Sequence, residues 1–227
     1  MSTTATTRIL LVRHGATQLT AEDRFAGDVG VDLSDEGRSQ AARLGERLRD
    51  EAIRAVYASP LSRTLETAQI VAGPHGLPIV QRPELREISH GRWEGLTRRE
   101  VEQRFGEEYA AWETDPFTFA PQGGESGLGV LARSLPVLRE IVVAHADQTV
   151  LVVSHKATIR ILLSSVLGID ARGYRDRLDQ SPACLNVLDF KGPVRARLML
   201  FNDISHYRDR PRLTQANLSK WWDPDKA

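Results

Sequence analysis

The sequence predicts an α/β protein, a three-layer α/β/α sandwich around a mainly parallel sheet. Short, continuous apolar runs alternate with amphipathic helical segments along most of the chain. Apolar runs of this kind are typical of strands buried on both faces of a parallel sheet. The expected strands are RILLV (8–12), IRAVYAS (53–59), TVLVVS (149–154), LNVLDF (185–190) and ARLMLF (196–201).

The helical segments carry recognisable start and stop signals. The first has Ser34 as its candidate N-cap, and its expected apolar face consists of Ala41, Leu44, Leu48 and Ala52. In the second, Ser59 is the candidate N-cap, Pro60 takes the first helical position and Gly73 ends the helix. A third helix is expected over KATIRILLSSVLG, residues 156–168, directly after the third strand.

One segment departs from this alternation. Residues 97–129 contain five aromatic residues, two prolines and the glycine-rich run QGGESGLG. We expect a helical and loop insertion that covers the functional site and contacts the ligand. The whole chain, residues 1–227, is predicted to be a single domain that carries this insertion at about 97–129.

Composition limits the classes of partner. Thirty Lys and Arg balance thirty Asp and Glu, whereas nucleic-acid binders normally carry a basic excess, so no nucleic-acid partner is expected. Cys184 is the single cysteine, which excludes an internal disulfide and fits a reducing compartment. With neither a signal-peptide pattern nor an apolar run of about 20 residues, we expect a cytoplasmic protein with no membrane partner. A homodimer is left open.

Charged and imidazole side chains follow three of the predicted strands. Arg13 and His14 end the first strand, Arg63 lies in the first turn after the second, and His155 follows the third. In open α/β sheets, ligands bind at the carboxyl ends of the strands. Helix N-termini at the same edge add backbone N–H donors. A phosphoryl group suits this combination best, although each of these side chains alone has an ordinary reading as a solvated residue.

Four blocks of sequence carry a family resemblance. In order along the chain they are LVRHGAT, YASPLSRTLETA, LREISHGRWEGLT and VVSHKATIR, and FNDISHY near residue 201 resembles a late strand of the same family. Together they resemble the histidine phosphatase superfamily, which includes the phosphoglycerate mutases and many small phosphatases, and the phosphatase branch is the closer one. The resemblance covers most of the chain and implies a phosphoglycerate mutase-like fold.

The resemblance implies catalytic roles for five residues. His14 is the nucleophile that forms a phosphohistidine. Arg13, Arg63 and His155 hold the phosphoryl oxygens. Glu87 protonates the leaving group and then takes a proton from the attacking water. Glu84 and Glu94 are equally titratable from the sequence, and only the motif selects Glu87.

Further residues are candidates for substrate binding. Gly15 permits close backbone approach, and Thr17 fits the family pattern. Thr20 stands where the family usually has asparagine, so its phosphate contact is open. His90 either lines the pocket or is an ordinary loop residue. Lys156 is expected to present its backbone N–H, with its side chain solvated.

Competing chemistries lack their motifs. There is no P-loop, no H-E-x-x-H, and no arginine six residues after Cys184; neither a metal nor another cofactor is expected. The prediction is a phosphomonoesterase acting on a small phosphorylated metabolite. A phosphoglycerate-type mutase and a non-enzymatic phospho-ligand binder are the alternatives. In the insertion, Arg98, Arg99 and Arg104 either meet a second anionic group or form a solvated helix face; we favour the latter.

Overall fold

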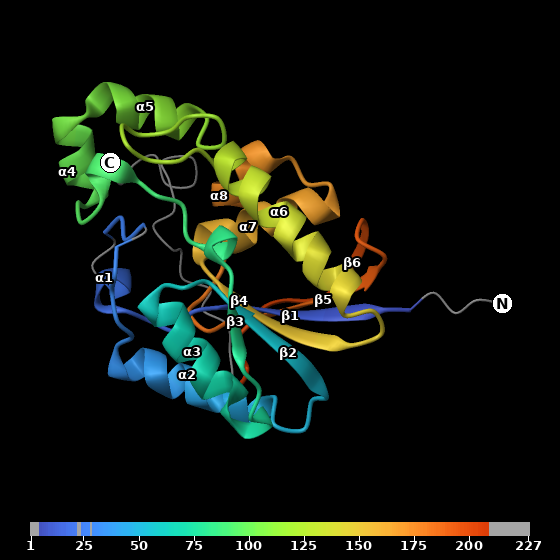
Figure 1. Cartoon of the computed structure of the whole chain (residues 1–227). Coiled ribbons are helices and arrows are strands. Elements are labelled where there is room, and N and C mark those ends of the chain that lie inside the picture. Colours follow the sequence, from blue (N-terminus) through green and yellow to red (C-terminus); the bar gives the residue numbers. More distant parts are fainter. Residues whose placement is uncertain (1–4, 22–23, 28, 209–227) are drawn as a thin grey trace.

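A six-stranded sheet lies between two layers of helices (Figure 1). The computed structural model describes residues 5–21, 24–27 and 29–208, without the side chains of Thr20 and Ala21. The strand order is β3-β2-β4-β1-β5-β6. The strands are β1 (Thr7–Arg13), β2 (Ile53–Ala58), β3 (Ile79–Gln81), β4 (Thr149–Ser154), β5 (Leu185–Lys191) and β6 (Arg195–Asp203).

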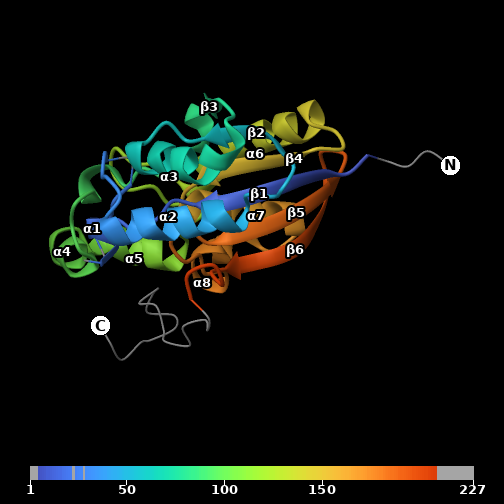
Figure 2. The ribbon, with the colours of Figure 1, turned by 90° about the horizontal axis from the view of Figure 1, so that it is seen from below.

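Helices cover both faces of the sheet. One layer contains α2 (Asp35–Arg47) and α3 (Ser62–Ala72), and the other contains α6 (Gly127–Ala144) and α7 (Lys156–Leu167) (Figures 1 and 2). The other α-helices are α1 (Gln18–Ala21), α4 (Arg98–Arg104), α5 (Gly106–Thr114) and α8 (Tyr174–Arg177). Single-turn 3₁₀ helices lie at Gly73–His75, Pro83–Leu85, Gly91–Trp93 and Ala171–Gly173.

The mainly parallel sheet is confirmed. Strands β3, β2, β4 and β1 run parallel, and β5 and β6 are antiparallel additions at one edge. The register pairs Arg13 with Ser154 and Ala58 with Val153. The carboxyl ends of β1, β2 and β4 therefore lie side by side, as the sequence prediction of a shared ligand site requires.

Alternating side chains of the central strands form two cores. Ile9 and Leu11 of β1 pack with α6 and α7, whereas Leu10 and Val12 pack with α2 and α3. All four side chains are at most 3% exposed. Successive residues of a strand point to opposite faces, so a continuous apolar run is what a strand covered on both sides requires.

Two predicted helix details are wrong. Helix α3 begins at Ser62 with Leu61 as its N-cap, not at Pro60 with Ser59. The Ser59 hydroxyl instead pairs with the His155 ring at 2.7 Å, and its contact with the Leu61 N–H is a long 3.5 Å. The expected apolar face of α2 also runs too far, because the helix ends at Arg47 and Ala52 is exposed.

The segment predicted as an insertion forms α4 and α5 and has its own small core. Phe25, Trp93, Val101, Tyr109 and Trp112 make up this apolar cluster. The segment lies beyond the carboxyl ends of the parallel strands (Figure 1). At its glycine-rich end Gly127 starts α6, where the Ser126 hydroxyl accepts from the N–H of Gly129.

The part of the chain that the structure describes contains no helix long and apolar enough to cross a bilayer. Within the same residues, no group of three or more His, Cys, Asp or Glu side chains is arranged to hold a metal ion.

Candidate active site

A cavity lies at the carboxyl ends of the parallel strands and extends to the insertion. Strand β1, helices α3, α4, α5, α7 and α8 and the loops near residues 25 and 88 all contribute to its wall. Its lining residues are Arg13, His14, Thr17, Leu19, Arg24, Phe25, Ala26, Gly27, Arg63, Glu87, Ile88, His90, Arg98, Trp112, Lys156, Ala157, Arg160, Tyr174 and Arg175.

His14 lies directly after β1, where its backbone N–H donates to the Ser154 carbonyl and extends the β1–β4 pairing by one residue. The ring Nδ1 is 2.8 Å from the Gly15 carbonyl oxygen. A carbonyl oxygen can only accept, so Nδ1 carries the proton and Nε2 has a free lone pair. Burial, followed by the charges of Arg13 and Arg63, lowers the pKa of His14 well below 6.5. A neutral imidazole with a free Nε2 is the form that can act as a nucleophile.

Two buried arginines flank His14. Arg13 is 6% exposed and Arg63 is 1% exposed. Arg63 donates to the carbonyls of Gly27 and Val29, which fixes the plane of its guanidinium. Arg13 donates one bond to the Gln180 carbonyl, and its buried Nε has no partner among the described residues. These two cations give the cavity fixed positive charge next to the His14 ring.

His155 is completely buried behind the cavity wall, as the N-cap residue of α7. Its ring centroid is 5.2 Å from that of His14, and its Nε2 lies 2.7 Å from the Ser59 hydroxyl. Nδ1 has no hydrogen-bond partner within the described chain. Burial, followed by the charge of Arg63, lowers the pKa of His155 well below 6.5, so His155, like His14, is neutral near pH 7.

Glu87 enters the cavity at the N-terminus of α7. Its carboxylate accepts from the backbone N–H groups of Ala157 and Thr158 at 3.1 and 3.2 Å, from the Thr158 hydroxyl at 3.3 Å, and from the Ile88 N–H at 3.0 Å. A carboxylate is well placed at the positive end of a helix dipole. Glu84 and Glu94 do not line the cavity, so of the three glutamates that the sequence offered, Glu87 is the one that does.

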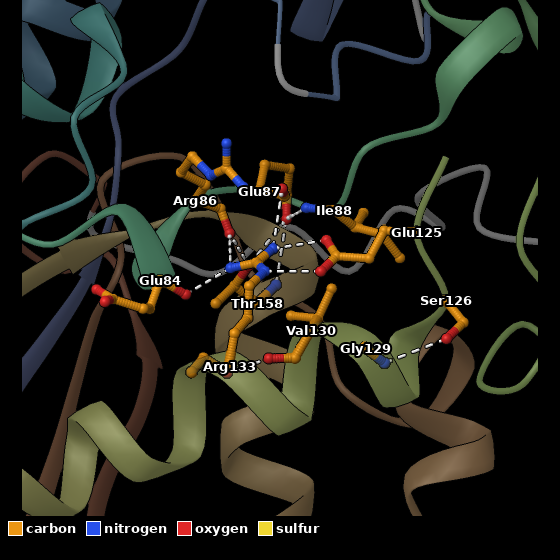
Figure 3. A network of polar contacts seen from close by, with 11 residues as sticks. Glu84, Arg86, Glu87, Ile88, Glu125, Ser126, Gly129, Val130, Arg133 and Thr158 are labelled. Atoms are coloured by element: carbon orange, nitrogen blue, oxygen red, sulfur yellow. Dashed lines mark hydrogen bonds and ion pairs between the residues drawn. The ribbon is translucent and has the colours of Figure 1, made fainter. Parts of the chain in front are cut away.

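Arg133 of α6 holds the Glu87 segment in place (Figure 3). It donates to the carbonyl oxygens of Glu84, Arg86 and Glu87 and forms a two-point ion pair with Glu125. From α7, the Thr158 hydroxyl also donates to the Arg86 carbonyl. The loop that carries Glu87 is therefore fixed from two helices, and nothing in the motif blocks identified Arg133.

The remaining sequence candidates differ in whether they line the cavity. Thr17, His90 and Lys156 line the cavity. Gly15 makes its close approach to α2, because an added Cβ would lie 2.5 Å from the Gly37 carbonyl oxygen. The Thr20 side chain lies outside the described part of the structure. The expectation of a solvated Lys156 is wrong, since this side chain is only 32% exposed and borders the cavity.

Several cavity residues were missed as binding candidates. Arg160, Tyr174 and Arg175 are buried in the wall. Arg160 had a signal, because it follows Lys156 by four residues and therefore shares its face of the helix. In the insertion, Arg98 borders the cavity whereas Arg99 and Arg104 are exposed. The prediction that these three arginines form a solvated helix face is therefore right for Arg99 and Arg104 and wrong for Arg98.

Fold and site together define an α/β protein with a cationic pocket and two neutral imidazoles at the ends of its parallel strands. The profile of the histidine phosphatase superfamily (branch 1) matches residues 9–204. The chain belongs to this superfamily, as the sequence resemblance predicted.

Two similar curated proteins are named as phosphatases. Phosphoserine phosphatase 1 of Hydrogenobacter thermophilus is 35% identical over 163 residues, covering 72% of this chain and 77% of the relative. Glucosyl-3-phosphoglycerate phosphatase of Mycolicibacterium vanbaalenii is 36% identical over 169 residues, covering 71% and 75%. Among solved structures, Bacillus stearothermophilus YhfR superposes with a TM-score of 0.83 at 32% identity, covering 88% of this chain and 98% of that one. These findings make the chain a hydrolase that acts on phosphate monoesters.

Proposed function

We propose that the protein hydrolyses small phosphorylated metabolites through a phosphohistidine intermediate on His14. The observation that carries this proposal is the state of the His14 ring, with Nδ1–H held by the Gly15 carbonyl and Nε2 unprotonated in a cavity flanked by Arg13 and Arg63. Two arginines next to a neutral imidazole are suited to bind a phosphoryl dianion and stabilise the charge that develops during its transfer.

The reaction proceeds in two displacements. His14 Nε2 attacks phosphorus, and the bond from phosphorus to the ester oxygen breaks while Glu87 donates its proton to that oxygen. Water then attacks the phosphohistidine, Glu87 takes a proton from this water, and the N–P bond breaks to release inorganic phosphate and restore the enzyme. Arg13 and Arg63, with His155 behind His14, bind the transferred group in both steps.

The names of the two curated relatives refer to phosphoserine and glucosyl-3-phosphoglycerate as their substrates. They support a small phosphorylated metabolite as the substrate here and favour hydrolysis over mutase-type transfer or mere binding. We further propose a single domain over residues 1–227, with residues 97–129 covering the site. A cytoplasmic location and phosphate contacts by Gly15, Thr17 and Thr20 stay predictions of the sequence, and the oligomeric state stays open.

The test is phosphate release from a panel of phosphomonoesters. The wild-type protein is expected to release phosphate from at least one ester, and His14→Ala to lower kcat/KM by about 10⁴ or more while circular dichroism stays unchanged. Acid-labile, alkali-stable phosphate on the quenched wild-type protein would identify the phosphohistidine. With 3-phosphoglycerate, isomerisation without phosphate release would indicate a mutase. Substantial turnover by a folded His14→Ala variant would refute the nucleophile.

Glu87→Gln separates the acid–base role from the nucleophile. A proton donor matters most for a poor leaving group, so we expect a loss of about 10²- to 10⁴-fold with alkyl phosphates. The loss is expected to be much smaller with p-nitrophenyl phosphate, whose leaving group needs no proton. An equal loss on both substrates would contradict the general-acid assignment.

A further inference from the structure

The cavity carries more positive charge than one phosphoryl group requires. Among the residues that the structure describes, seven arginine and lysine side chains line the cavity, and Glu87 contributes the one carboxylate. Two of these cations, Arg13 and Arg63, flank the nucleophile and are accounted for by the phosphoryl group. The other five come from the loop at residue 24 and from helices α4, α7 and α8. They line the rest of the cavity, where the leaving group of the substrate has to be accommodated.

Carboxylates of the protein neutralise some of these five cations. Arg24 pairs with Glu100 at the cavity margin. Arg175 is held between Glu113 and Asp176 at 3.3 and 3.1 Å. These contacts give both arginines counterions of their own, so neither calls for an anion from a ligand.

Lys156 and Arg160 share one counterion between them. Asp179 accepts from Arg160 Nη2 at 3.1 Å and lies 3.8 Å from Lys156 Nζ. One carboxylate thus serves two cations, and that carboxylate is itself 43% exposed. Among the described residues, the wall formed by α7 therefore has an excess of one positive charge when Lys156 is protonated.

This excess charge is poorly hydrated. The Arg160 side chain is 5% exposed, and its buried Nε has no hydrogen-bond partner within the described chain. Burial, followed by the charges of Arg160 and Arg13, lowers the pKa of Lys156 to about 7. A buried cation without full compensation destabilises the protein, and an anion bound at this point would offset that cost.

We propose that Lys156 and Arg160 form a second anion-binding subsite beside the phosphoryl site, which selects phosphomonoesters whose leaving group carries its own anionic group, such as a carboxylate. The two side chains are one helical turn apart on α7 and face the same cavity as His14 and Glu87. The inference rests on the proposed function, because it assigns the leaving-group half of the same cavity.

Pairs of esters that differ in one carboxylate test this subsite. One pair is 3-phosphoglycerate and glycerol 3-phosphate, and the other is O-phosphoserine and phosphoethanolamine. We expect kcat/KM to favour the carboxylate-bearing member of each pair by about tenfold or more, as for other charge-assisted contacts. A ratio near one in both pairs would overturn the proposal.

Substitutions then show which residues cause the preference for carboxylate-bearing esters. Lys156→Met and Arg160→Met are expected to reduce the ratio several-fold, and Asp179→Asn to increase it, because that change removes the internal competitor. Arg139→Met and Lys191→Met remove exposed charges away from the cavity and are expected to keep the wild-type ratio. If Arg160→Met fails to fold, Lys156→Met and Asp179→Asn still show whether this pair of cations causes the preference for the carboxylate. A ratio that none of the three variants changes would refute the assignment.

The subsite can fail separately from the proposed function. Absence of turnover with every ester, including p-nitrophenyl phosphate, would refute the hydrolytic function. In that case calorimetric titration of 3-phosphoglycerate and glycerol 3-phosphate into the wild-type protein and Lys156→Met measures the same preference as a ratio of Kd values. Equal Kd values for the two esters would refute the subsite.

Discussion

The two ends of the cavity are built from different parts of the fold. At the phosphoryl end, Arg13 and His14 lie at the carboxyl end of β1, and Arg63 lies in the first turn of α3, the helix that follows β2. At the leaving-group end, Lys156 and Arg160 lie on α7. Arg98 and Trp112 complete this end from helices α4 and α5 of the inserted segment.

This difference separates shared chemistry from specificity. Strand register and two apolar cores fix the phosphoryl end, so its geometry is a property of the sheet. The leaving-group end depends on a smaller cluster around Trp93 and Trp112 and on ion pairs at the cavity margin. We therefore expect changes at the phosphoryl end to affect the reaction with every ester, and changes at the other end to affect the choice among esters.

The largest of the remaining expected effects is a loss of stability in acid that arises at the phosphoryl end. His14 and His155 are buried and neutral, with pKa values well below 6.5. Below pH 6.5 the unfolded chain binds protons at these residues that the folded chain excludes, so stability falls as the pH decreases. Between pH 7.5 and 5.5 we expect the two histidines to lower the free energy of unfolding by about 2 kcal/mol.

Urea unfolding at the two pH values measures this loss. His14→Gln removes one of the two titrating groups, so the variant is expected to lose about 1 kcal/mol less than the wild type over the same interval. An identical acid loss in the wild type and the variant would show that the buried imidazole of His14 is not its source.

The phosphoryl end is also where sequence reasoning was most complete. Arg13, His14 and Arg63 each lie at a strand end or in the first turn that follows, and a parallel sheet brings such positions together. The spacing of apolar runs was therefore enough to predict their proximity. The motif resemblance supplied the rest, since only it distinguished Glu87 from Glu84 and Glu94.

At the leaving-group end the sequence was less informative, for a physical reason. Whether Arg98 or Arg99 faces the cavity depends on how α4 is rotated on the cluster around Trp93, and no periodic pattern records that rotation. Arg133 lies 46 residues from Glu87 along the chain, and the bond it donates goes to a backbone carbonyl. Carbonyl acceptors leave no mark in a sequence, so Arg133 was found only in the structure.

A smaller effect on activity is expected from substitution of Arg133, whose hydrogen bonds hold the loop that carries Glu87 (Figure 3). Arg133→Met removes the hydrogen bonds that Arg133 donates to the carbonyls of Glu84, Arg86 and Glu87, although the Arg86 carbonyl keeps the Thr158 hydroxyl as a donor. The Glu87 carboxyl is therefore expected to be less well positioned. We expect kcat with alkyl phosphates to fall about tenfold, and less with p-nitrophenyl phosphate.

The dependence of the kcat loss on the leaving group distinguishes a role of Arg133 in positioning Glu87 from general damage to the fold. A purely structural role would lower kcat equally for both substrates. Arg133→Met also leaves Glu125 unpaired, so the double variant Arg133→Met/Glu125→Leu serves to remove that charge as well. Arg139→Met, an exposed arginine on the same helix, is the matched control and is expected to behave as the wild type.

The smallest expected effect is on KM, and it is tested by comparing two adjacent arginines of the insertion. Arg98 borders the leaving-group end and is half-buried, whereas Arg99 is exposed on α4. The attraction between a partly solvated cation and an anionic leaving group is screened by water and salt. Arg98→Gln is therefore expected to raise KM for 3-phosphoglycerate about threefold with kcat unchanged, and Arg99→Gln to leave both constants as they are. Equal effects of the two substitutions would mean that the insertion acts only through its overall charge. If Arg98→Gln lowered kcat for every ester, Arg98 of α4 would belong to the phosphoryl end. The division of the cavity into a catalytic and a selective half would then be wrong.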